Sequence, residues 1–129
     1  MVATARKSIF VTFTKEGVHK FPAAATDPTL ATGDWDDVSY LANEHRHIFH
    51  FRVDISVEHS DREIEFIQFK RWIERLYDHG ALQLDNKSCE MIAGDLGGQI
   101  LDKYPGRGLR ISVSEDGENG AVLEWSGER

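Results

Sequence analysis

The sequence has few of the features that mark secreted, membrane or nucleic-acid-binding proteins. Its 129 residues include one cysteine, Cys89, which cannot form an internal disulfide, so we expect a reducing cytoplasm. No apolar run approaches the roughly 20 residues that cross a bilayer, and no secretory signal follows Arg6 and Lys7. Lysine and arginine total 15 against 22 acidic residues. This balance argues against a general binder of long nucleic acids.

The chain does contain enough apolar material for one folded domain. Hydrophobic residues make up 40% and charged residues 29%, which is typical of a globular protein. A chain of this length buries roughly two thirds of the surface that its unfolded form exposes. We therefore expect a single domain over residues 1–129, with a long loop at residues 20–44.

Four segments alternate apolar and polar residues with the period of a β-strand. They are residues 8–14, 45–59, 109–114 and 121–125. The second is the longest and predicts a strand with one buried face. Between the last two, residues 115–120 predict a turn, with Asn119-Gly120 as a strong hairpin pair.

Apolar residues at helical spacing predict two helices between the second and third strands. Ser60 and Glu63 have the spacing of a capping box, which predicts the start of the first helix, and Gly80 predicts its end. Ser88 is a favourable cap for the second helix, which we expect to stop at Tyr104.

This order of elements, ββααββ, predicts an α+β fold. Two hairpins that flank two helices form a four-stranded antiparallel sheet with both helices on one face. The other face then needs a cover, and a second copy of the chain is the simplest one. We therefore expect a symmetric homo-oligomer.

Three histidines are the first candidates for chemistry. His45 and His47 are two residues apart on a strand, so both point to the same face, and His19 can lie beside them on the neighbouring strand. Three imidazoles suit Zn²⁺ with an open fourth position. The alternative is that these rings end the apolar stripe and bind only backbone groups.

Two further sites have competing interpretations. Asp78-His79 pairs a carboxylate with a possible general base, but a polar pair also suits the end of a helix. Cys89 follows a helix cap, which favours a thiolate. Its spacing with Ile92 and Ala93 indicates instead a buried, inert thiol.

Arginines and asparagines form a candidate site for an anionic ligand. Guanidinium groups bind phosphate bidentately, so a local arginine pair can act despite the net charge of −7. The candidate ligand-binding residues are Arg62, Asn86, Arg107, Arg110 and Asn119, with Trp35 as a stacking partner. Glu90, Glu115 and Glu118 are possible acceptors or parts of a solvated surface. The alternative for the arginines is a surface that balances the 22 acids.

The order of elements resembles the 6-pyruvoyl-tetrahydropterin synthase and 6-carboxytetrahydropterin synthase group, whose unit is the T-fold. The group's two-histidine strand motif is similar to His45-Arg46-His47, which implies zinc with His19 as third ligand. Its pterin-anchoring glutamate is similar to Glu115. Units of this kind form trimers that close a barrel and often pair into hexamers.

The same resemblance extends to the group's Asp-His pair, which is similar to Asp78-His79, and places Glu90 at the start of the second helix. One departure is clear. The group's catalytic cysteine lies a few residues before the histidine pair, and here residues 36–44 contain none. This puts the group's usual chemistry in doubt.

A second resemblance is carried by four strings of the sequence. They are HRHIFHF (45–51), SDREIEF (60–66), SCEMIA (88–93) and SEDGENGA (114–121). These strings resemble the first family of phage Thoeris anti-defence proteins. The resemblance implies a dimer or hexamer that sequesters a cyclic ADP-ribose isomer or a cyclic oligonucleotide in the cytoplasm of an infected bacterium. It implies no catalytic residue and no cofactor, and zinc belongs only to the pterin-synthase alternative.

Overall fold

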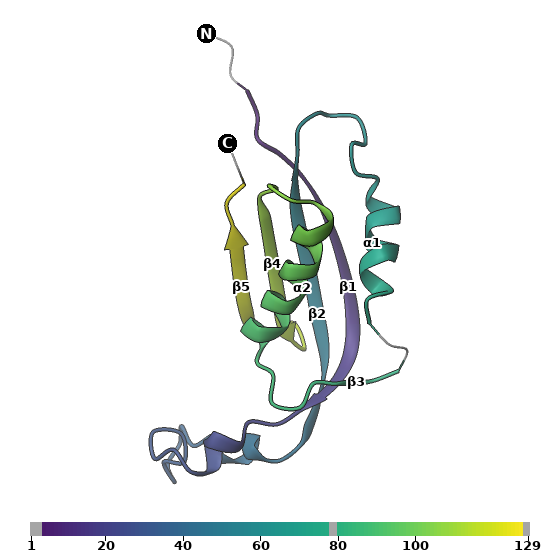
Figure 1. Ribbon diagram of the computed structural model, residues 1–129. Coiled ribbons are helices and arrows are strands. Elements are labelled where there is room, and N and C mark those ends of the chain that lie inside the picture. Colours follow the sequence, from purple (N-terminus) through teal and green to yellow (C-terminus); the bar gives the residue numbers. More distant parts are fainter. Residues whose placement is uncertain (1–3, 78–79, 128–129) are drawn as a thin grey trace.

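The computed structural model describes residues 4–77 and 80–127 and consists of a long sheet with two helices on one face (Figure 1). The strand order is β3-β1-β2-β4-β5. The strands are β1 (Lys7–His19), β2 (His45–Val57), β3 (Leu82–Gln83), β4 (Leu109–Glu115) and β5 (Asn119–Trp125). The helices are α1 (Phe66–Glu74) and α2 (Cys89–Lys103), and residues 20–44 contain the short 3-10 turns η1 (Pro22–Ala25) and η2 (Ser39–Ala42).

The α+β prediction is confirmed, but the predicted four-stranded sheet is one strand short. The fifth strand, β3, pairs in parallel with β1 through Gly17–Leu82 and Val18–Gln83. A strand of two residues is too short for its alternation to be recognised in a sequence. Among the described residues, no helix has the length and apolarity needed to cross a bilayer.

The core lies between the helices and the inward face of the sheet. β1 and β2 pair over their whole length, from Lys7–Val57 to His19–His45. Alternate residues of β2 and apolar residues of both helices are almost inaccessible, and each such large side chain contributes about 1.5–3 kcal/mol. They include Phe49, Phe51, Val53, Ile55, Phe69, Ile73, Leu96 and Ile100.

The first helix begins later than predicted. Glu65, rather than Ser60, is its N-cap and accepts hydrogen bonds from the amides of Ile67 and Gln68. Glu63 instead accepts a 2.7 Å hydrogen bond from the amide of Glu58. The capping-box prediction is therefore wrong, because Glu63 has a tertiary role that competes with a cap.

The helix ends are a second correction. α1 ends at Glu74, before the predicted stop at Gly80. The cap of α2 is confirmed, since Ser88 accepts a 3.1 Å hydrogen bond from the amide of Met91, and α2 ends at Lys103 next to Tyr104.

The hairpin between β4 and β5 turns within the predicted residues 115–120, but its tip is not the predicted Asn119-Gly120 pair. Asp116 and Gly117 have positive φ values of 58° and 74°, the conformation of a type I′ turn. Asn119 and Gly120 already belong to β5. Gly120 is needed there because a Cβ would lie 2.2 Å from the carbonyl oxygen of Val113. This turn places Asp116 directly after the end of β4.

Candidate metal centre

The structure brings the three candidate histidines together at one end of the β1–β2 pair. His19 lies opposite His45, and Gly17 lies opposite His47, so the three rings share the face that carries the core further along the strands. One ligand atom from each ring lies within 4.8 Å of the others. This end of the sheet is where the loop of residues 20–44 leaves β1 and returns to β2 (Figure 1).

Two of the rings are oriented by backbone carbonyl groups. The Nδ1 atom of His19 lies 2.9 Å from the oxygen of Lys87, and Nδ1 of His45 lies 2.8 Å from the oxygen of Asn43. Because a carbonyl oxygen only accepts, each Nδ1 carries the proton. In the neutral ring the lone pair is then on Nε2.

The third ring is oriented by a carboxylate. Nδ1 of His47 donates to Oδ2 of Asp116 at 2.7 Å, and Oδ1 of Asp116 accepts from the amide of Ile48 at 2.9 Å. The hydrogen bonds from Ile48 and then His47 lower the pKa of the Asp116 carboxyl. All three histidines therefore have the outer partner that metal-ligating histidines usually have.

The Nε2 atoms of His19 and His47 are buried, and no described residue gives either atom a hydrogen bond. The Glu115 carboxylate lies 3.4 Å from Nε2 of His19 and 3.1 Å from Nε2 of His47, without hydrogen-bond geometry. Lone pairs that face a carboxylate at these distances repel it unless a cation or a proton lies between them. Three imidazoles are ligands that Zn²⁺ accepts, and the negative charge of Glu115 beside them favours a cation, so these residues fit a zinc ion.

A glycine makes room for this arrangement. Phe49 packs beneath the rings, with its centroid 5.3 Å from that of His19 and 5.9 Å from that of His47. A Cβ on Gly17 would lie 2.8 Å from atoms of both Phe49 and Leu84, closer than real Cβ atoms approach. Gly17 therefore lets the apolar floor of the site pack against β1.

The segment that follows β3 holds the end of β1 in place. The amide of Leu84 donates to the oxygen of Val18 at 3.0 Å, and the amide of Lys20 donates to the oxygen of Asp85 at 2.8 Å. These two hydrogen bonds flank His19, whose side chain is 8% exposed. The backbone on both sides of His19, a candidate zinc ligand, is thus held in place.

Cys89 is buried at the start of α2, as predicted. Burial above all, and then the charges of Glu115 and Glu90, raise the pKa of its thiol to about 11. The group is a thiol at neutral pH and is a poor nucleophile in this state.

The anion-site candidates are divided between the two ends of the sheet. Arg62 is exposed and bonds Asp61, and Arg107 donates to the carbonyl of Ser56 and pairs with Glu63. These groups and Arg110 lie at the end opposite the histidines. Asn86 and Asn119 are exposed at the histidine end, beside Lys87 and opposite Glu115 respectively.

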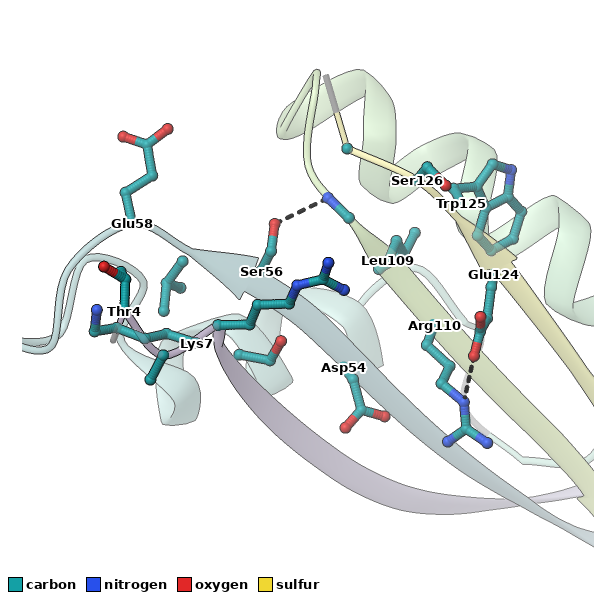
Figure 2. Close-up of a pocket in the computed structure, with 16 residues that line it drawn as sticks. Thr4, Lys7, Asp54, Ser56, Glu58, Leu109, Arg110, Glu124, Trp125 and Ser126 are labelled. Atoms are coloured by element: carbon teal, nitrogen blue, oxygen red, sulfur yellow. Dashed lines mark hydrogen bonds and ion pairs between the residues drawn. The ribbon is translucent and has the colours of Figure 1, made fainter. Parts of the chain in front are cut away.

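Arg110 borders a cleft of about 870 Å³ at the arginine end (Figure 2). Its lining also includes Lys7, Asp54, Glu58 and Glu124. The guanidinium of Arg110 donates to Glu124 at 2.9 Å. The cleft therefore contains charges of both signs, and Arg110 already has a carboxylate partner.

The remaining candidates do not join either group. Trp35 is 91% exposed in the loop of residues 20–44, and Glu90 and Glu118 are exposed. Asp78-His79 lies outside the described residues. The residue that the sequence analysis missed is Asp116, whose only signal was its place before Gly117 in the hairpin turn.

The sequence matches no family model, and it matches no curated protein sequence at a significant level. A solved structure does resemble this chain: an uncharacterized protein, WS1659, from Wolinella succinogenes, at a TM-score of 0.69. The two sequences are 13% identical, and the match covers 93% of this chain and 98% of that one. At this identity the likeness shows a shared fold and nothing further.

Proposed function

We propose that this protein is a T-fold, zinc-dependent enzyme of the kind represented by the 6-pyruvoyl- and 6-carboxytetrahydropterin synthases. One observation carries the proposal. The Nδ1 atoms of three neighbouring histidines each have an acceptor, so their Nε2 lone pairs are left for a shared ligand. If the rings had only a structural role at the end of the apolar face, their buried nitrogens would be expected to have hydrogen-bond partners, and two of them have none among the described residues.

The proposed roles follow from the positions of the side chains. His19, His45 and His47 would hold the metal, which when bound would supply a Lewis acid for an oxygen of the substrate. Glu115, whose side chain is 29% exposed, accepts hydrogen bonds from the amino and ring N–H groups of a pterin-like heterocycle. Apolar Phe49 beneath the rings keeps water from the inner side of the site.

The absence of a cysteine from residues 36–44 narrows the proposed reaction. Cys89 does not replace it, because its thiol is buried and protonated at neutral pH. We therefore propose a reaction that forms no covalent thiol intermediate.

The proposed assembly is a ring of copies that closes the sheet into a barrel, as a trimer or a hexamer. Phe10, Ile48 and Val122 are each more than 40% exposed and occupy outward positions of their strands, on the face without helices. Among the described residues, no strand pairs with the outer edge of β5. An open edge and a partly apolar face both favour contact with another copy.

The test combines metal analysis with turnover. The protein, purified without chelators, is analysed for metal and then incubated with reduced pterins that carry a side chain at position 6. We expect about one zinc per chain and a product of altered mass, both lost in His47→Ala. An unmetallated wild-type protein would contradict the proposal.

A second candidate function is sequestration of a cyclic nucleotide signal without cleavage. The cleft of about 870 Å³ with Arg110 and Lys7 on its border favours it, since both side chains suit a pyrophosphate. The test is incubation with cyclic ADP-ribose isomers, removal of free ligand and heating. Release of the unchanged signal supports sequestration, and release of nothing or of an altered molecule contradicts it.

A further inference from the structure

Asp116 makes three hydrogen bonds that join the β4–β5 turn to the start of β2. Its amide donates to the carbonyl of Ile48 at 2.7 Å, its Oδ1 accepts from the amide of Ile48 at 2.9 Å, and its Oδ2 accepts from Nδ1 of His47 at 2.7 Å. The residue has a φ of 58°, a conformation that favours glycine over a residue with a side chain. A carboxylate therefore stands at a position where the backbone alone would suit glycine.

We propose that Asp116 is the positioning residue of the metal centre: it fixes the Nδ1–H tautomer of His47 and so directs the Nε2 lone pair toward His19 and His45. This inference rests on the proposed metal site and deepens it. The tautomers of His19 and His45 are fixed by backbone carbonyl groups, which are present whatever the side chain at those positions. The tautomer of His47, in contrast, depends on the side chain of Asp116.

Asparagine cannot reproduce the hydrogen bonds of Asp116. Both carboxylate oxygens accept hydrogen bonds, whereas an amide has one accepting oxygen and one donating NH₂ group. One end must accept from the amide of Ile48, so in an asparagine this end is the oxygen. The NH₂ group then faces Nδ1 of His47 and donates to it. The ring responds by carrying its proton on Nε2, where no lone pair remains for a metal.

The test is Asp116→Asn, compared with the wild-type protein by long-range ¹H–¹⁵N correlation of the histidine rings without metal. We expect Nδ1 of His47 to be protonated in the wild type and Nε2 to be protonated in the variant. Zinc affinity, measured by competition with a chelator, is expected to fall about 10–100-fold, the usual effect of losing an outer partner. Asp54→Asn is the matched control, because Asp54 is on the same strand as His47 and pairs with Arg52.

The outcomes separate this inference from the proposed function. If the His47 ring of the wild type carries its proton on Nε2, the inference is overturned. This measurement needs no variant, so it decides the question even if Asp116→Asn does not fold. Where the wild type binds zinc, an equal zinc affinity in a folded Asp116→Asn also overturns it. If the tautomers differ as expected but the wild type binds no zinc, the positioning role holds and the proposed metal function fails.

Discussion

The two ends of the sheet differ in whether their polar side chains have partners. At the arginine end, Arg107 pairs with Glu63 and Arg110 with Glu124, so each of these two guanidinium groups has a carboxylate partner. At the histidine end, buried Nε2 atoms face one another and a carboxylate without a hydrogen bond. Pairing is what folding alone favours, because an unsatisfied buried polar atom costs about 1–3 kcal/mol. The histidine cluster, in which Nε2 of His19 and of His47 has no hydrogen bond from a described residue, is therefore the one that we assign to ligand binding.

The largest expected difference between the two ends is in metal affinity. His19→Ala removes a ligand, and we expect zinc affinity to fall by about 100-fold or more, beyond the loss of an outer partner. Arg110→Ala at the opposite end is the control and should leave zinc affinity unchanged. Chelator competition measures both, and an equal response of the two variants would remove the distinction.

A second expected difference concerns packing beneath the histidines. Gly17→Ala places a methyl group 2.8 Å from Phe49 and Leu84, so we expect a loss of about 1–3 kcal/mol in the free energy of unfolding. Gly98 lies in α2, and a Cβ added to it would meet no other atom within 4 Å. Gly98→Ala should stabilise the protein by up to about 1 kcal/mol, through helix propensity. Urea denaturation of both variants tests the contrast.

The sequence anticipated the histidine end better than the details around it. Strict alternation over β2 placed His45 and His47 on one face with Phe49 and Phe51, and this pattern is encoded locally. The start of α1 was missed because Glu63 bonds Glu58 and Arg107 instead of capping, a tertiary contact that no spacing reveals. Asp116 lies inside the predicted turn, but its hydrogen bonds with His47 and Ile48 are tertiary contacts that no spacing in the sequence reveals.

The arginine end should control part of the dependence of stability on pH. The amide of Glu58 first, and then Arg107, hold the pKa of Glu63 below its ordinary value of 4.5 in the folded protein. The ionised group therefore stabilises the fold above pH 4.5, and this contribution is lost as pH falls through the lowered pKa. Glu63→Gln should reduce the loss of stability between about pH 6 and pH 3. Parallel pH profiles for the variant and the wild type would contradict this assignment.

The smallest expected effect is that of an exposed ion pair. The side chains of Arg110 and Glu124 are 47% and 67% exposed, so Arg110→Ala should change the free energy of unfolding by less than about 1 kcal/mol. Thermal denaturation in low and high salt measures this difference. A larger loss would mean that the cleft residues are organised for more than surface pairing.

X-ray absorption at the zinc edge of the wild-type protein tests whether His19, His45 and His47 bind a metal together. We expect about one zinc per chain, bound by three histidine nitrogens at about 2.0–2.1 Å with an oxygen as a further ligand and no sulfur. A protein that holds no zinc after equilibration with the metal, or a bound zinc with fewer than three histidine ligands, would contradict it.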